Sequence, residues 1–67
     1  MVMSNKEMAE AFNKAADIVK EERHKAELAA ARSARDSQWD DETYYRAKAE
    51  GLAKAEQLLR GHAEELA

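Results

Sequence analysis

Large apolar residues recur at seven-residue intervals through the second half of the chain. Together with the alanines between them, they are Tyr45, Ala49, Leu52, Leu59, Ala63 and Leu66, and only Glu56 interrupts the series. A seven-residue period keeps side chains on one face of an α-helix, and that face needs a second surface to cover it. The sequence therefore predicts a helix over about residues 40–65 that packs against another helix.

A similar series in the first half of the chain supplies the partner helix. Its members are Met8, Phe12, Ala15, Val19, Ala26 and Ala29, and it continues to Ser33. Glu22 interrupts this series as Glu56 interrupts the other. Ser4 and Glu7 precede it with the spacing of a capping box, in which each side chain satisfies a free backbone N–H group. We predict a first helix over about residues 5–36.

Residues 36–41 form the only cluster that resembles a turn, because Ser and Asp side chains compete for backbone hydrogen bonds. Two starts for the second helix are open. Ser37 with Asp40 has the spacing of a capping box, whereas Asp40 as the N-cap would let Trp39 pack on Tyr44. Either start places acidic residues in the first turn, where the helix dipole favours them.

A single uninterrupted helix is the alternative to a hairpin, because no Gly or Pro lies between Ala34 and Tyr45. The phase of the two series argues against it. The twelve residues from Ser33 to Tyr45 would rotate one series by roughly 120° from the other in a straight helix. A hairpin lets the two apolar faces meet. We therefore predict an all-α fold, an antiparallel two-helix hairpin that forms a single domain over residues 1–67.

The small size of the chain points to self-association. Chains of 67 residues bury a limited share of their surface and usually need a disulfide, a metal or a partner, and the chain has no Cys. Ile18, Leu28 and Leu58 lie off the two series and would stay partly exposed in a lone hairpin. We predict a homodimer, a coiled coil or four-helix bundle of two hairpins, whose core and dimer seam are the two apolar series.

The charge balance disfavours nonspecific binding to polyanions. Charged residues make up 37% of the chain and the net charge is −3, whereas a generic nucleic-acid binder is expected to be basic. No apolar stretch approaches the roughly 18–20 residues that span a bilayer, and the N-terminus lacks the layout of a signal peptide. We expect a cytoplasmic protein without a membrane partner.

Two features raise the question of a metal site. Glu21 and His24 have the Glu-x-x-His spacing of carboxylate-bridged bundles, and Glu22 and Glu56 would lie at the same height in an antiparallel pair. The alternative is that these side chains face solvent, as His62 does in the last helical turn, and we predict no bound metal or cofactor. The few hydroxyl residues have no evident His partner, so we predict that the protein is not an enzyme.

Aromatic and basic residues gather at the predicted turn. They are Trp39, Tyr44, Tyr45, Arg32, Arg35 and Arg46. Aromatic and Arg side chains are typical anchors of protein interfaces, so this group is a candidate partner-binding surface. The alternative is a local cap in which Trp39 closes the end of the core. Asp36, Asp40 and Asp41 lie among these residues and weaken a nucleic-acid interpretation.

The segment from Trp39 to Arg60 contains Tyr-Arg-Ala-Lys-Ala-Glu-Gly at residues 45–51. It resembles segments of small helical proteins from bacteriophages, particularly those of actinobacteria. The resemblance implies a phage accessory protein that binds a host protein in the host cytoplasm. We therefore predict a non-enzymatic protein–protein interaction module. The architecture is also similar to the Rop-type RNA-binding dimer, so a nucleic-acid-binding hairpin that uses Arg32, Arg35, Arg46 and Lys48 is the alternative.

Overall fold

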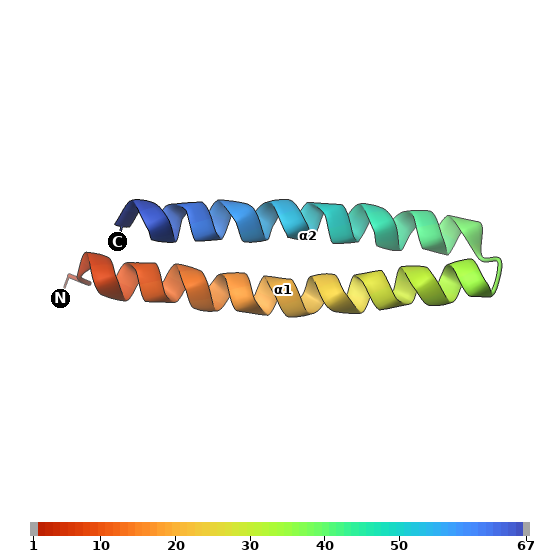
Figure 1. Cartoon of the computed structure of the whole chain (residues 1–67), viewed down its shortest axis with the longest axis horizontal. Coiled ribbons are helices and arrows are strands. Elements are labelled where there is room, and N and C mark those ends of the chain that lie inside the picture. Colours follow the sequence, from red (N-terminus) through yellow and green to blue (C-terminus); the bar gives the residue numbers. More distant parts are fainter. Residues whose placement is uncertain (1, 67) are drawn as a thin grey trace.

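The chain folds into two long helices that lie side by side and run in opposite directions (Figure 1). The computed structural model describes residues 2–66, so residues 1 and 67 of the predicted domain lie outside it. Helix α1 spans Asn5–Arg35 and helix α2 spans Trp39–Leu66. The hairpin measures 52 × 16 × 14 Å. The predicted all-α hairpin is confirmed.

The start of α1 is capped by Ser4. The Ser4 hydroxyl accepts a hydrogen bond from the backbone N–H of Glu7 at 3.1 Å and donates one to Glu7 Oε1, also at 3.1 Å. One of the two hydrogen bonds of the predicted capping box is therefore present, the bond from the Glu7 backbone N–H to the Ser4 hydroxyl. The Glu7 carboxylate accepts from the same hydroxyl. This cap satisfies one of the N–H groups that the first helical turn leaves free.

The end of α1 is a Schellman motif, in which two hydrogen bonds close the last turn around a left-handed residue. The backbone N–H of Gln38 donates to the carbonyl of Ser33 at 2.8 Å, and that of Ser37 donates to the carbonyl of Ala34 at 3.2 Å. Ser37 has φ = 59°, in the left-handed region that usually holds Gly. Three residues therefore suffice to reverse the chain between the two helices.

Helix α2 starts without either of the predicted side-chain caps. Its first hydrogen bond runs from the N–H of Glu42 to the carbonyl of Gln38 at 2.9 Å, so Gln38 precedes the first helical residue, Trp39. Both predicted starts were wrong, because Ser37 already closes the end of α1 and Asp40 lies inside the helix. The acidic residues still occupy the first turn, where the positive end of the helix dipole stabilises them.

Replacing Ser37 by Gly is expected to stabilise the hairpin by about 1 kcal/mol, because Gly adopts the left-handed conformation without the steric cost of a Cβ atom. Thermal unfolding followed by circular dichroism at a fixed protein concentration should show the gain as a rise in Tm. Ser37→Ala, which keeps the Cβ atom, is the control and should bring no comparable rise. An equal effect of both substitutions would contradict the assigned motif.

The contact between the helices repeats every seven residues, with positions a and d of each heptad facing the other helix. Position a holds Ala9, Ala16, Arg23 and Ala30 in α1, and Glu42, Ala49, Glu56 and Ala63 in α2. Position d holds Phe12, Val19, Ala26 and Ser33 in α1, and Tyr45, Leu52, Leu59 and Leu66 in α2. The apolar residues that are buried are all alanines, whereas every large residue at position d is only half-buried. The helices therefore meet over small side chains, and the large ones lie at the edge of the contact.

The residue that interrupts the seam in α1 is Arg23, and the prediction of Glu22 was wrong. Glu22 is exposed and its carboxylate pairs with Lys25, at 3.2 Å. Adjacent alanines at residues 15–16 and 29–30 allow two neighbouring phases of the apolar series, and the sequence pattern alone does not separate them. The structure places all twelve residues of the two predicted series in buried or half-buried positions.

Candidate interaction surfaces

A layer of charged residues crosses the middle of the seam. Arg23 Nη2 lies 3.3 Å from Glu56 Oε1, which joins the two helices. Arg60 Nε donates to the other oxygen of Glu56 at 3.0 Å, and Arg60 Nη2 donates to Asp17 Oδ1 at 3.0 Å. Arg23 also binds Glu27, at 3.0 Å. Five side chains thus form one continuous network of alternating charge.

The network fixes the charge state of its central carboxylate. The hydrogen bond from Arg60 is the largest cause that lowers the pKa of Glu56 below its ordinary value; partial burial opposes this, and the positive charge of Arg23 adds to it. The pKa of Arg60 is raised, first by its hydrogen bond to Asp17 and then by that to Glu56. Glu56 is therefore a carboxylate acceptor at neutral pH. Such a group aligns two helices but offers no free proton for acid catalysis.

The acidic and imidazole groups considered for a metal do not come together. His24 Nδ1 lies 3.8 Å from Glu27 Oε1 on the exposed surface, Glu22 pairs with Lys25, and Glu56 is occupied by two Arg side chains. Within residues 2–66 the structure contains no group of three or more side chains that could hold a metal ion. The prediction that Glu22 meets Glu56 in the seam was wrong, because Glu22 is exposed and the seam residue that pairs with Glu56 is Arg23.

The aromatic residues near the turn do not share one environment. Trp39 and Tyr44 are 64% and 62% exposed, whereas Tyr45 is half-buried in the seam. The ring of Tyr44 meets that of Tyr45 edge to face, with centroids 5.1 Å apart. Since Trp39 leaves most of its surface in solvent, it does not close the end of the core, and the cap interpretation is not supported.

The basic residues near the turn also differ. Arg46 Nη2 lies 2.7 Å from Glu42 Oε1, so this guanidinium is held along its own helix. Arg32 and Arg35 are exposed, and neither forms an ion pair with another of the residues that the structure describes. The turn end of the hairpin therefore has two exposed cations that no described residue neutralises by an ion pair.

The hairpin has two sides with different chemistry. Positions e and b of both helices lie on one side of the plane through the helix axes, and positions g and c lie on the other. The ion pair between Asp17 and Arg60 lies on the first side, which we call the polar side. The rings of Phe12 and His62, with centroids 5.5 Å apart, mark the second, which we call the apolar side. Trp39 belongs to the polar side and Tyr44 to the apolar side, so the predicted aromatic group is divided between them.

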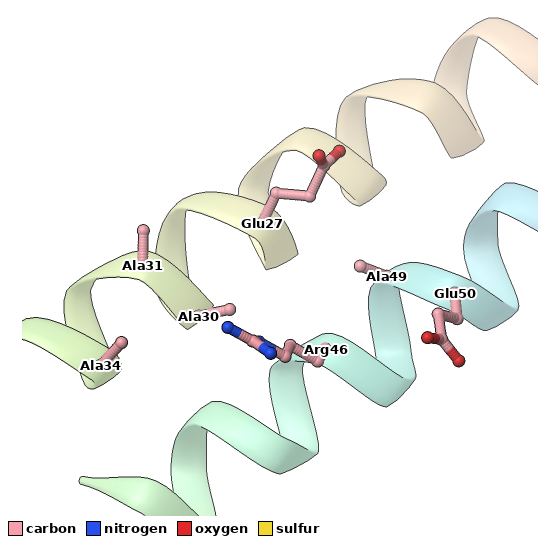
Figure 2. A pocket seen from close by; sticks show the side chains of 7 residues that line it. All are labelled: Glu27, Ala30, Ala31, Ala34, Arg46, Ala49 and Glu50. Atoms are coloured by element: carbon pink, nitrogen blue, oxygen red, sulfur yellow. The ribbon is translucent and has the colours of Figure 1, made fainter. Parts of the chain in front are cut away.

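A shallow groove on the polar side has small residues at its base (Figure 2). Its volume is about 320 Å³, and its lining comprises Glu27, Ala30, Ala31, Ala34, Arg46, Ala49 and Glu50. Figure 2 shows Ala30 and Ala49 pointing into the space between the helices, while Glu27 and Glu50 point away from each other at its margins. The groove is open, methyl groups line its base, and its charged side chains lie at its margins.

The apolar side carries a groove of a different kind. The residues that line it are Met3, Met8, Ala11, Phe12, Ala15 and Leu59, and its volume is about 360 Å³. Ile18 and Leu58 continue this surface and are 64% and 66% exposed. Their exposure agrees with the prediction that they lie off the seam. The apolar side therefore presents large side chains that no other part of residues 2–66 covers.

Among the described residues, neither helix is long and apolar enough to cross a membrane. Comparisons with protein-family models, with curated proteins and with solved structures find no match to this chain.

Proposed function

We propose that the protein is a non-enzymatic, all-helical module that binds another protein through the turn end of the hairpin, the end formed by residues 32–46. The observation that carries the proposal is the exposure of Trp39, 64%, at the rigid start of a helix. Trp is the residue type that most often anchors a protein interface, because a large flat ring excludes water from its contact at a small entropic cost. Arg32 and Arg35 are further exposed residues of the turn end and supply cations there.

The charges at this end favour a protein partner over a nucleic acid. Asp36, Asp40 and Asp41 lie among the aromatic residues, and the whole chain has a net charge of −3. A phosphate backbone would meet these carboxylates, whereas a protein surface can offer both signs of charge. The proposal includes two expectations from the sequence. The protein is encoded by a phage, and its partner is a protein of the host cytoplasm.

Trp39→Ala is expected to weaken partner binding at least about tenfold, because the anchor ring is lost. The chain contains no Cys, so a single Cys added after the C-terminus can attach it to a support with the turn end facing outward, since the turn lies at the far end of the hairpin (Figure 1). A nuclease-treated lysate of an actinobacterial host is passed over the unmodified chain and over Trp39→Ala. Proteins held only by the unmodified chain are identified and their affinities are measured.

Leu28→Ala is the matched control, because Leu28 is 67% exposed but lies on the outer face of α1, away from the turn. It should retain the same proteins as the unmodified chain. Proteins that bind Trp39→Ala equally well would contradict a Trp39-centred surface. A gel shift with RNA or DNA that weakens steeply with salt would replace this proposal with the nucleic-acid alternative.

A further inference from the structure

The large apolar residues of the seam all lie toward one side of the hairpin, the apolar side. Position d lies on the same side of the seam as positions g and c, and it holds the half-buried Phe12, Val19, Leu52 and Leu59. Position a, toward the polar side, holds buried alanines or charged residues. The hairpin therefore resembles one of two layers of a larger helical core, because its small side chains lie between its own helices and its large ones lie at its apolar surface.

The accessible area of the hairpin exceeds that of a compact protein of its mass. The chain exposes 5268 Å², whereas a compact globular protein of 7.6 kDa exposes about 4,300 Å². The excess of about 1,000 Å² is somewhat more than the roughly 800 Å² that each partner buries in a standard protein interface. One partner of similar size is enough to cover it.

Most of the exposed large apolar residues of the apolar side, Met3, Ile18 and Leu58, lie toward the open end, where α1 begins and α2 ends (Figure 1), and Tyr44 near the turn is the exception. This open-end half comprises residues 3–22 and 52–66. The ion pairs of Arg23 with Glu56 and of Asp17 with Arg60 show the register of the helices, and they place Ile18 and Leu58 at nearly the same height.

Toward the turn the apolar side changes character. The exposed residues at its g and c positions there include Lys25, Lys48 and Arg32, with Asp41 as the opposing charge and Tyr44 as the large apolar residue. The d positions of α1 hold Ala26 and Ser33, which are small. This half of the apolar side therefore carries a net positive charge, and α1 offers little apolar surface there for a partner to cover.

We propose that a second copy of this chain docks on the apolar side, with the open-end half of each hairpin covering that of the other in inverted orientation. This arrangement avoids two unfavourable contacts. A full-length inverted overlap would place the cations of one turn end on the apolar residues of the other copy. A parallel overlap would bring the two sets of Lys25, Lys48 and Arg32 together.

The arrangement is two-fold symmetric, as expected for a contact between identical surfaces. With the two-fold axis near Ala15, Phe12 of each copy lies at the level of Val19 of the other, and Met8 lies at the level of Leu52. Large side chains thus meet the half-buried d residues that the single hairpin leaves open. The turn ends point outward in opposite directions and take no part in the contact. The proposed dimer and the proposed function of the turn end can therefore be tested independently.

The first test is the dissociation constant, measured by sedimentation equilibrium between 1 and 100 µM, a range set by typical homodimer affinities of roughly micromolar. The unmodified chain is expected to be a dimer. Leu58→Glu and Ile18→Glu should each raise the dissociation constant at least about 100-fold, because every substitution places a carboxylate on both faces of the interface. Leu28→Glu, equally exposed but on the outer face of α1, should leave it unchanged. A monomeric chain, or equal weakening by all three variants, would overturn the proposal.

The second test does not depend on a weakened variant. A spin label attached to Ala11→Cys or to Arg32→Cys reports the distance between copies, and no other Cys competes for the label. At a rise of 1.5 Å per residue, the inverted overlap predicts a separation along the dimer of about 13 Å at residue 11 and about 50 Å at residue 32. Similar short distances at both sites would show a parallel dimer and overturn the arrangement. An apolar helical peptide that binds a monomeric chain at this face would assign the face to another protein.

Discussion

Glu56→Gln is expected to lower the Tm of the hairpin by roughly 5 °C, a change that corresponds to the loss of charge-assisted hydrogen bonds in a chain of this size. Gln keeps the shape of the side chain but removes the negative charge between Arg23 and Arg60. The two guanidinium groups would then face each other across the seam with only a neutral amide between them. Thermal unfolding at pH 7 and at a fixed protein concentration measures the change.

The pH dependence of this difference follows from the direction of the pKa shift. The pKa of Glu56 is lower in the folded chain than its ordinary value of 4.5. Its contribution to stability is therefore fully present above pH 4.5 and is lost as the pH falls through the lower, folded-state pKa. The difference in Tm between the unmodified chain and Glu56→Gln should shrink below pH 4.5. A difference that is constant between pH 7 and pH 2 would contradict the role assigned to the carboxylate.

The double variant Arg23→Leu with Glu56→Leu tests whether the charged pair stabilises the hairpin or serves only to align its two helices. Replacing both members of the charged pair by apolar residues is expected to leave the Tm equal to or above that of the unmodified chain, since buried ion pairs seldom stabilise more than well-packed apolar groups. The Nε atom of Arg23, buried with no hydrogen-bond partner among the described residues, adds a cost that the double variant removes. A strongly destabilised double variant would show that the network itself holds the hairpin together.

Ala16→Leu is expected to destabilise the hairpin by about 1–3 kcal/mol even though Leu is the more hydrophobic residue. Ala16 is 0% exposed, and two other residues of position a, Ala9 and Ala30, are also buried. A Leu side chain at position 16 must push the helices apart or adopt a strained rotamer, and separation of the helices would loosen the other alanine contacts of the seam. Chemical denaturation in urea measures the loss.

Ala47→Leu is the control for Ala16→Leu. Ala47 is exposed on the outer face of α2, and Leu and Ala have similar helix propensities. The control should change the free energy of unfolding by no more than about 0.5 kcal/mol. If Ala16→Leu stabilised the chain, the close approach of the helices over small residues would be refuted.

The positions of the helices could be predicted from the sequence because local interactions determine them. The cap at Ser4 and the period of the two apolar series placed the helices at about 5–36 and 40–65, against the observed Asn5–Arg35 and Trp39–Leu66. The way in which α2 begins was not predicted, because the turn depends on the left-handed conformation of Ser37, which Gly usually signals. With Ser at this position, the pattern of polar residues suggests side-chain caps that do not form.

The chemistry of the two sides could not be predicted, because it depends on which of two neighbouring phases α1 adopts. Choosing Glu22 as the seam residue suggested a layer of carboxylates, whereas the observed phase brings Arg23 to Glu56 and produces a charge-balanced pair. The periodic series contains the large residues in both phases, so only the packing of the two helices separates them.

The phase shift between the two apolar series also bears on domain swapping, in which two chains exchange helices through a straightened turn. If residues 36–38 became helical, α1 and α2 would join into one rod whose apolar faces point roughly 120° apart. Two such rods could not bury both faces against each other without a sharp twist at the former turn. The position of the Schellman motif in the heptad count thus favours pairing of each helix with the other helix of its own chain over an exchange of helices between chains.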